Sequence, residues 1–153
     1  MRDGRLSWAD LGEALGLSAP AAAERVRRLR SDGVISGFTA KVDPERVGLG
    51  LTVYVAVRVG RPEDRPKLLS YAAERPEVQE CHHVTGDDDY LLKIRCSGVR
   101  RLETILSEEL KGTIPSVVTR TTLVLSTVKD SSVLPIEADG KEKRSSRPRR
   151  KRR

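Results

Sequence analysis

The fold of this chain is constrained most strongly by the stretch from Ser7 to Gly33, SWADLGEALGLSAPAAAERVRRLRSDG. It predicts two short helices: Ser7 is placed to cap the first, and Gly16 can adopt the left-handed conformation that ends it. Ser18 is placed to cap the second helix, which has Pro20 in its first turn. Apolar residues recur at helical spacing in both. They are Trp8, Leu11 and Leu15 in the first helix, and Ala22, Val26 and Leu29 in the second.

The outward face of the second predicted helix is charged and mostly basic. Its charged residues are Glu24, Arg25, Arg27, Arg28 and Arg30. A helix, a short turn with a glycine and a second helix with a basic face is typical of a helix-turn-helix, whose second helix enters the DNA major groove. A helical hairpin with a solvated cationic face fits the same pattern, so these residues by themselves leave both interpretations open.

The positive charge of the chain is concentrated in its last residues. The 153-residue chain has a formal net charge of +7, and residues 141–153 (KEKRSSRPRRKRR) carry nine Lys and Arg and one Glu. The remainder of the chain is therefore close to neutral, and basic surfaces for nucleic acid are predicted only at the second helix and at the C-terminus. The C-terminal run fits a non-specific DNA-binding arm, an RNA-binding arm or a solubilising segment.

No apolar run has the length of a signal peptide or a membrane span, so we expect a cytoplasmic protein without membrane contact. Cys81 and Cys96 are too few for a disulfide framework, and we expect both to be buried free thiols in strands. Cys81 and its neighbours His82 and His83 place at most two ligands on one strand face, and no spaced partner pair completes a metal site. We therefore expect neither a metal nor another cofactor.

The second half of the chain predicts a ferredoxin-like unit in the order βαββαβ. Its first strand alternates aliphatic residues on one face with Thr52, Tyr54 and Ala56 on the other. This second face is too apolar to stay in water, so we expect another sheet to cover it, most simply in a two-fold dimer. The expected strands are 51–59, 78–84, 90–96 and 117–128, and the expected helices are 62–75 and 99–110. The residues expected to face inward are Leu68, Leu69, Ala72 and Ala73 in the first of these helices, and Leu102, Ile105 and Leu106 in the second.

These elements predict an α+β chain of two domains and a tail. The expected divisions are a helix-turn-helix domain at 1–42, a hinge at 43–48, a βαββαβ domain for effector binding and oligomerisation at 49–130, and a disordered basic tail at 131–153. Two short helices bury little apolar surface, and only a short polar segment precedes Ser7. We therefore expect the natural start of the domain to lie further upstream.

Four segments of the sequence carry a resemblance to a known family. They are LGLS at 15–18, RVRRLRSDGVISGFTAKVDPERVGLG at 25–50, CHHVTGDDDYLLKI at 81–94 and SVVTRTTLVLSTVK at 116–129. They resemble the Lrp/AsnC (feast/famine) regulators of bacteria and archaea. The resemblance implies a winged helix-turn-helix, a βαββαβ ligand-sensing domain, and homodimers that assemble into octamers and bind an amino acid or related small molecule between dimers. The family's first helix, however, is absent here.

The resemblance implies that the second helix of the N-terminal pair binds double-stranded DNA. Its arginines are expected to contact phosphates, and Arg27 is the best candidate for a contact in the groove because it lies four residues after Ala23. Ser18 is expected to donate to a phosphate at the helix start. Alanines stand where the family usually has polar side chains, and their methyl groups predict weak sequence selectivity. The expected DNA-binding residues are Ser18, Ala19, Ala21, Ala23, Arg25, Arg27 and Arg28.

The resemblance also implies that the loop between the two middle strands binds the effector. Gly86 allows the backbone to approach a ligand, an aspartate can pair with an α-ammonium group, and backbone N–H groups can hold an α-carboxylate. A solvated hairpin turn explains the same residues. The expected effector-binding residues are Thr85, Gly86, Asp87, Asp88, Asp89 and Tyr90, with Thr119 and Thr121 as weaker candidates.

The function expected from these features is that of a ligand-responsive transcriptional regulator without catalytic activity. The sequence contains no Gly-rich phosphate loop and no Ser/His/Asp or Cys/His set at a convincing spacing. Two alternatives stay open. One is a ligand-sensing or assembly partner of the same family that does not bind DNA. The other is a tetrapyrrole-modifying enzyme of similar build, which would act through His82 or His83.

Overall fold

The computed structural model describes residues 4–135 of the chain, so the basic run at 141–153 lies outside the described residues. The described part forms two compact units. Residues 4–38 and 129–135 belong to the first unit, and residues 39–128 form the second. Each unit has a distinct architecture, because the first contains helices only and the second contains a helix-covered sheet.

The first unit contains the predicted helix pair, α1 (Trp8–Leu15) and α2 (Ala19–Ser31). The Ser7 hydroxyl accepts a hydrogen bond from the Asp10 N–H at 3.1 Å, and Gly16 ends α1 with a φ of 66°. Gly12 is buried, and a Cβ at this position would lie 2.7 Å from the Leu17 carbonyl oxygen. Only glycine therefore lets the turn pack this closely against α1. This requirement was not predicted from the sequence.

The second helix begins as predicted after Ser18, whose hydroxyl accepts a hydrogen bond from the Ala21 N–H at 3.3 Å. The predicted apolar stripe is confirmed by burial. Its buried or half-buried members are Ala22, Val26 and Leu29. Trp8 and Leu15 of α1, by contrast, remain 49% and 51% exposed. The helix pair thus leaves apolar surface uncovered within the described part of the chain.

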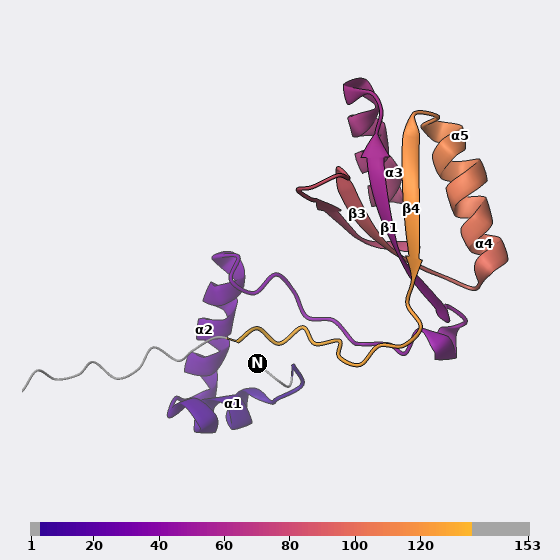
Figure 1. The fold of residues 1–153 in the computed structure, drawn as a ribbon. Coiled ribbons are helices and arrows are strands. Elements are labelled where there is room, and N and C mark those ends of the chain that lie inside the picture. The colour runs from indigo at the N-terminus through magenta and orange to yellow at the C-terminus, as the bar shows by residue number, and fades with distance from the viewer. Residues whose placement is uncertain (1–3, 136–153) are drawn as a thin grey trace, which may run out of the picture. The chain divides into compact units, whose positions relative to one another are not determined.

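The second unit is a four-stranded antiparallel sheet with its helices on one face (Figure 1). The strand order β2-β3-β1-β4 and the chain order βαββαβ confirm the predicted ferredoxin-like fold. The strands are β1 (Leu51–Val59), β2 (Val78–His83), β3 (Tyr90–Cys96) and β4 (Val117–Leu123). The helical segments are η1 (Glu45–Val47), η2 (Pro62–Asp64), α3 (Arg65–Glu74), α4 (Val99–Glu103), η3 (Thr104–Leu110) and α5 (Lys111–Thr113).

The core lies between the sheet and these helices. In β1, Val53, Val55 and Val57 have no exposed surface, as the predicted alternation requires. On β3 they are joined by fully buried Leu92 and Ile94. The opposite face of β1 is half-buried at Thr52, Tyr54 and Ala56 in the single chain. The sheet therefore has one packed face and one face that none of its own helices covers (Figure 1).

Helix α3 presents a different set of residues to the core than the sequence predicted. Leu68 and Ala72 are buried as expected, but Leu69 is 46% exposed and Ala73 does not join the core cluster. Tyr71 is buried instead, and its hydroxyl donates a hydrogen bond to the Ile105 carbonyl at 3.3 Å. Burial raises the pKa of Tyr71 to about 12. The prediction for Leu69 and Ala73 was wrong because the buried Tyr71, whose hydroxyl is hydrogen-bonded, decides which side of the helix faces the core.

Several predicted boundaries also differ from the structure. The second long helix runs beyond Leu110 to Thr113 and contains a π-helical stretch, η3, in its middle. The last strand ends at Leu123 and not at Val128, and β2 ends at His83. Local pattern alone cannot locate such ends, because pairing with the neighbouring strand decides where a strand stops.

A charged network ties the helix layer to the rest of the unit. Arg101 donates to Glu77 and to Glu109, each at 2.5 Å, and Arg75 lies 3.4 Å from Glu109. The hydrogen bond from Arg101 lowers the pKa of Glu77 below its ordinary value. This network joins α4, η3 and the segment from the C-cap of α3 to the start of β2.

The two cysteines have different surroundings. Cys96 is buried as expected, but Cys81 is exposed, so the prediction of a second buried thiol was wrong. Cys81 lies on β2, which pairs with β3 and forms an edge of the sheet as described for residues 4–135. An edge strand has a neighbour on one side only, which leaves its side chains more accessible.

Candidate DNA interface and effector site

The arginines expected to bind DNA lie on the solvent-facing side of α2. Arg27 pairs with Glu24 at 2.6 Å, and Arg28 lies 3.8 Å from Asp32; the two arginine side chains are 70% and 81% exposed. Arg25 is also exposed. Both acidic partners belong to the same helical segment. Such exposed pairs are worth at most about 1 kcal/mol, so an external anion can replace them readily.

The start of α2 offers small groups for close approach. The Ser18 oxygen is occupied by the Ala21 N–H, which leaves the Ser18 hydroxyl hydrogen able to donate to a phosphate. Ala21 is exposed, whereas Ala19 and Ala23 are half-buried. Of the three alanines, Ala21 therefore presents the most accessible methyl group.

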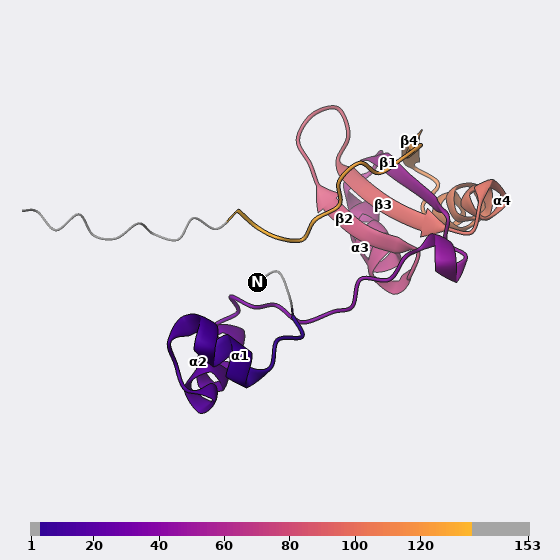
Figure 2. The same ribbon diagram turned by 90° about the horizontal axis from the view of Figure 1, so that it is seen from below.

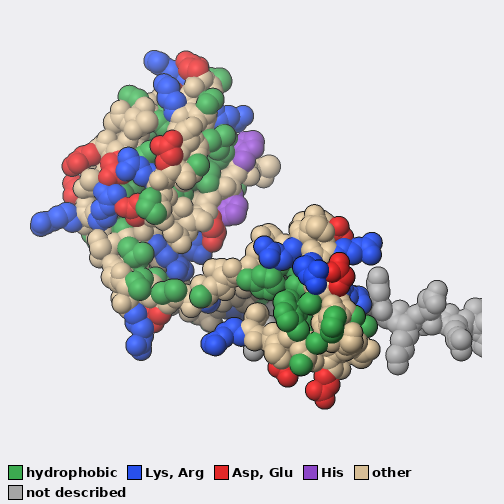
Figure 3. Space-filling view, turned by 180° about the vertical axis from the view of Figure 1, so that it is seen from behind, with side chains coloured by type: hydrophobic (Ala, Val, Ile, Leu, Met, Phe, Trp, Pro, Cys, Tyr) green, Lys and Arg blue, Asp and Glu red, His purple; other side chains and the backbone are tan. Residues whose placement is uncertain are grey.

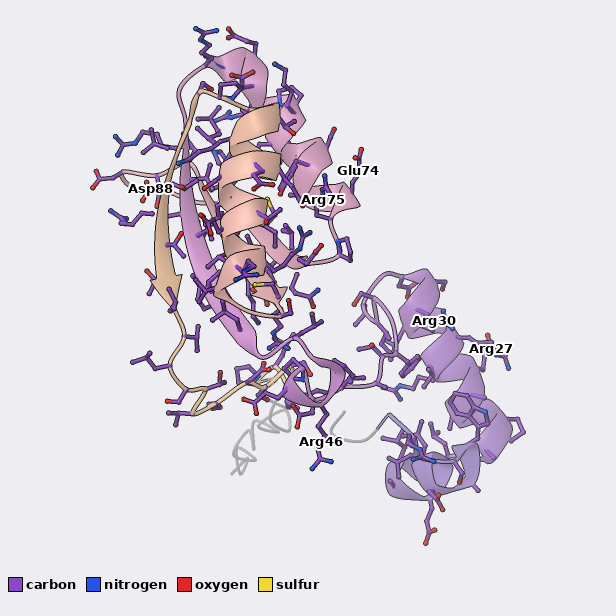
Figure 4. The ribbon with its side chains drawn as sticks, turned by 90° about the vertical axis from the view of Figure 1, so that its right-hand side faces the viewer. Arg27, Arg30, Arg46, Glu74, Arg75 and Asp88 are labelled. Carbon is purple, nitrogen blue, oxygen red and sulfur yellow. The ribbon has the colours of Figure 1, made fainter. Side chains whose placement is uncertain are left out.

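Arg30 was not among the predicted DNA-binding residues, and the structure gives it a different neighbour. Its guanidinium lies 6.0 Å from the centroid of the Phe38 ring. Both residues line an open hollow of about 320 Å³ on the first unit, whose other lining residues are Gly4, Leu6, Trp8, Leu11, Val26 and Arg27. Figure 3 shows exposed hydrophobic side chains on this unit beside Lys and Arg. Arg27 and Arg30 both project from α2 (Figure 4).

The predicted effector loop connects β2 to β3 and projects from the sheet (Figure 2). It is closed by a hydrogen bond from the Val84 N–H to the Asp89 carbonyl at 3.0 Å. Gly86 has a φ of 116°, a conformation that side-chain-bearing residues rarely adopt. The Asp89 N–H donates to the Val57 carbonyl at 2.9 Å, so the loop is joined to the end of β1.

The three aspartates of this loop have different roles. Asp88 accepts a hydrogen bond from Arg120 at 2.6 Å. The Asp89 carboxylate accepts the Val59 N–H at 2.8 Å. The Asp87 carboxylate is exposed and forms no hydrogen bond or ion pair with any described residue, while its backbone carbonyl accepts the Arg58 Nε–H at 2.7 Å.

Three arginines from different elements therefore surround the loop, and none of them was predicted from the sequence to lie there. They are Arg58 of β1, Arg65 of α3 and Arg120 of β4. Arg65 lies 3.9 Å from Asp89, 3.5 Å from the His83 ring nitrogen and 5.9 Å from the centroid of the Tyr90 ring. No local signal could have identified these arginines, because each lies more than 15 residues from its partner in the loop. Their contribution makes the site one of mixed charge.

The remaining predicted effector residues are less accessible. Tyr90 is 4% exposed and belongs to the core, with its ring centroid 5.0 Å from that of His83. Thr119 and Thr121 pair with Val57 and Val55, so they share the helix-covered face of the sheet and are half-buried. Thr85 is exposed. The structure thus brings the aspartates and the arginines together at the loop, and it places Tyr90, Thr119 and Thr121 on the inner face.

The histidines next to the loop make separate contacts. His82 lies 3.2 Å from Glu80, which also accepts a hydrogen bond from Lys93 at 2.8 Å. His83 lies beside Tyr90 and Arg65. Among residues 4–135 there is no group of three or more His, Cys, Asp and Glu residues that could hold a metal ion. No helix in this range is long and apolar enough to cross a membrane.

Comparison with known proteins agrees with this geometry. Residues 1–30 match the model of the AsnC-type helix-turn-helix domain, and residues 52–134 match that of the Lrp/AsnC ligand binding domain. The chain is 38% identical over 128 residues to the HTH-type transcriptional regulator LrpA of Mycobacterium tuberculosis, a match that covers 82% of each chain. It is 38% identical over 139 residues to the leucine-responsive regulatory protein of Escherichia coli K12, covering 89% of this chain and 84% of the relative.

A solved structure gives the same result. The feast or famine regulatory protein of M. tuberculosis, complexed with L-methionine, superposes with a TM-score of 0.76 at 36% identity, covering 86% of this chain and 88% of that chain. Both halves of the chain therefore match, in sequence and in fold, proteins that regulate transcription. The chain belongs to the Lrp/AsnC family of ligand-responsive, DNA-binding transcriptional regulators.

Proposed function

We propose that this regulator binds duplex DNA through α2 and senses an amino acid at the loop between β2 and β3. The observation that carries the proposal is the exposed arginine face of α2 within a helix-turn-helix. Arg25, Arg27 and Arg28 contact phosphates and set the position of the helix on the duplex. Arg27 also reaches the edge of the groove, and Ser18 donates to a phosphate. Because Ala19, Ala21 and Ala23 offer only methyl groups, base readout is limited.

The effector in this proposal is an amino acid. Relatives are named leucine-responsive regulatory proteins, and a similar protein has been solved with L-methionine. The loop offers both charges that a zwitterion requires, since Asp87, Asp88 and Asp89 lie beside arginines. Gly86 is exposed and has a positive φ, so the backbone can approach a ligand closely at this position. Thr85 completes the exposed side of the loop, while Tyr90, Thr119 and Thr121 lie on the helix-covered face of the sheet.

The sheet supplies the dimer contact in this proposal. Tyr54 and Ala56 on the uncovered face are half-buried apolar residues, and Val118 on the same face is 66% exposed. A second copy of this face would remove these groups from water in a two-fold dimer, and further assembly would give an octamer. An effector that prefers one assembly then shifts DNA binding by that preference.

Each segment of the chain has its own role in this proposal. Residues 1–42 bind DNA, 43–48 act as the hinge, 49–130 bind the effector and the partner subunit, and 131–153 form a basic tail. The protein acts without catalysis in the cytoplasm, where its DNA lies.

Removing residues 141–153 is expected to weaken binding to all DNA sequences alike and to flatten its salt dependence, since that run carries nine Lys and Arg. An unchanged salt slope would assign the tail no role in DNA binding.

The second candidate function is that of a ligand-sensing partner that does not bind DNA. The observation that favours it is the uncovered apolar hollow beside α2, which includes Trp8 and Phe38. Titration of the purified chain against duplex fragments that flank its own gene separates the two. The regulator requires specific binding that changes when L-methionine or L-leucine is added. Binding that is absent at low salt would support the partner instead.

A further inference from the structure

We propose that the outer face of α3 is a second contact between copies of this chain, in which two α3 helices pack antiparallel about a two-fold axis. The occupant of this face is therefore the α3 helix of another copy. This contact is distinct from the sheet contact proposed above, because the helices cover the opposite face of the sheet (Figure 1). The inference rests on the proposed function in one respect, since it names the surface through which the proposed dimers assemble further.

The outer face of α3 exposes apolar groups that the sequence predicted to be buried. Leu69 is 46% exposed and Ala73 is also exposed, because Tyr71 takes the inward side of the helix. Pro66, about one turn before Leu69, is exposed as well. Residues at this spacing lie along one side of a helix. The resulting apolar stripe is of the kind that packs against another helix.

An open groove of about 380 Å³ runs beside this stripe. It is lined by Pro66, Lys67, Ser70, Tyr71, Glu74 and Arg75 of α3 and by Thr113 of α5. Helix α3 therefore presents both a ridge, formed by Leu69 and Ala73, and a groove. Ridges of one helix pack into the grooves of another, so a two-fold axis lets each copy insert its ridge into the groove of the other. Because both surfaces belong to one helix, the contact closes as a pair and does not extend into a filament.

The charges of α3 favour a second copy and set the direction of the pair. Lys67 and Glu74 lie about two turns apart on one side of the helix, and both are exposed. Glu74 points away from the sheet (Figure 4) and forms no hydrogen bond or ion pair with any residue in the range 4–135. In an antiparallel pair centred near Ser70, each Lys67 lies opposite Glu74 of the other copy. A parallel pair would place like charges together, so only the antiparallel arrangement is complementary.

Lys67 is already held in position for this contact. Its ammonium group donates a hydrogen bond to the Asp64 carboxylate at 2.7 Å, and Asp64 is 5% exposed and also accepts the Ser116 hydroxyl at 2.6 Å. The Lys67 side chain nevertheless remains 55% exposed, and its ammonium group has two further hydrogens for an external carboxylate. A side chain that is positioned beforehand loses less conformational freedom when it binds.

The first test measures association of the full chain by sedimentation velocity over a range of concentrations. Glu74→Lys replaces both ion pairs of the α3 contact with like charges and removes no side-chain contact within the described part of the chain. We expect it to weaken association beyond the dimer roughly 10-fold or more. Leu69→Ser, which removes the exposed apolar side chain, should also weaken association. Glu108→Lys is the matched control, because Glu108 is an exposed glutamate of η3 and should leave association unchanged.

A disulfide cross-link tests the direction of the pair. Ser70 lies at the centre of the proposed contact, so Ser70→Cys should link two chains under mild oxidation. The exposed Cys81 is first replaced by serine to remove its own reactivity. Ser107→Cys, at an exposed serine of η3, is the matched control and should give little linked product. Adding Glu74→Lys to Ser70→Cys should lower the yield of linked chains.

The outcomes separate this inference from the proposed function. If Ser70→Cys gives no more linked product than Ser107→Cys, the α3 contact is overturned, while DNA binding and the sheet contact are unaffected. Association that neither Glu74→Lys nor Leu69→Ser changes would likewise assign this face to a different protein or to none, and would overturn the contact. If the wild-type chain is a monomer at every concentration, the sheet dimer of the proposed function falls, and the Ser70→Cys link still decides on the α3 contact.

Discussion

The helix pair and the sheet unit use their arginines in opposite ways. On α2, Arg27 and Arg28 pair with acids of the same helical segment and remain largely exposed. In the sheet unit, Arg101 joins Glu77 and Glu109 from separate elements, and its side chain is only 31% exposed. Charges of the first kind are available to an external partner, whereas those of the second kind connect elements of the fold. The two units also differ in packing, since the helix pair leaves Trp8 half exposed.

The largest expected effect is the loss of unfolding free energy when a buried side chain is removed from the sheet unit. Leu92→Ala removes a fully buried side chain from the sheet and should cost about 2–5 kcal/mol of the free energy of unfolding. Leu11→Ala removes a half-buried side chain of α1 and should cost clearly less. Urea unfolding measures both, because fluorescence of the single tryptophan, Trp8, reports on the helix pair alone, whereas far-ultraviolet circular dichroism follows the helices and strands of both units. Equal costs would mean that the two units are equally well packed.

The next largest effect is the difference in stability between removing a buried-network arginine and removing an exposed one. Arg101→Ala leaves two half-buried carboxylates, Glu77 and Glu109, without their main partner and should cost about 1–3 kcal/mol. Arg28→Ala should change stability by less than about 0.5 kcal/mol, because its ion pair is exposed. Thermal unfolding followed by circular dichroism compares the two. A destabilisation by Arg28→Ala as large as that by Arg101→Ala would remove the distinction between the two classes of arginine.

A smaller effect is expected at the start of α2. Ser18→Ala removes the hydroxyl that accepts the Ala21 N–H and should cost about 1 kcal/mol, within the helix pair only. Ser18→Asp, which keeps a cap acceptor but adds a negative charge, should retain the stability and weaken DNA binding. Urea unfolding monitored by Trp8 and DNA titration give the two readouts. If the Ser18→Asp variant binds DNA as tightly as the parent chain does, a phosphate contact at this position is excluded.

The smallest effect is the pH dependence of the sheet unit. The pKa of Glu77 is lowered by its hydrogen bond with Arg101, from an ordinary value of 4.5. A depressed pKa in the folded state contributes stability above the ordinary value, and that contribution is lost as the pH falls through the lowered pKa. The melting temperature of the wild-type chain should therefore decrease as the pH is lowered from about 4.5. The Arg101→Ala variant should show a smaller decrease over the same pH range. Melting curves of both chains across the acidic range measure the difference, and Arg28→Ala should behave as the wild-type chain does.

The sequence predicted those features that depend on neighbouring residues. The Ser7 and Ser18 caps and the end of α1 at Gly16 are set by local backbone conformation, and the alternation in β1 follows from strand geometry. These predictions needed no knowledge of the rest of the fold. The order of elements followed from them, because strand and helix patterns alternate clearly between Leu51 and Leu123.

Features that depend on distant contacts could not be predicted. Tyr71 displaced Leu69 from the core because its hydroxyl reaches the carbonyl of Ile105, 34 residues away. The arginines around the loop could not be predicted for the same reason. Arg120, for example, contacts Asp88 only once β4 and the loop lie side by side in the folded chain. The loop itself was identified by resemblance, and its mixed charge became visible only in three dimensions.

The central claim is that the arginine face of α2 binds the phosphates of duplex DNA. The most direct test is the salt dependence of affinity for a labelled duplex, measured by fluorescence anisotropy for the wild-type chain and for the Arg25→Ala/Arg27→Ala/Arg28→Ala variant. We predict that the variant binds on the order of 100-fold more weakly to all sequences. The negative slope of log K against log salt should become less steep by about 2.7, or about 0.9 per lost contact. The same affinity and the same slope for both chains would contradict the account.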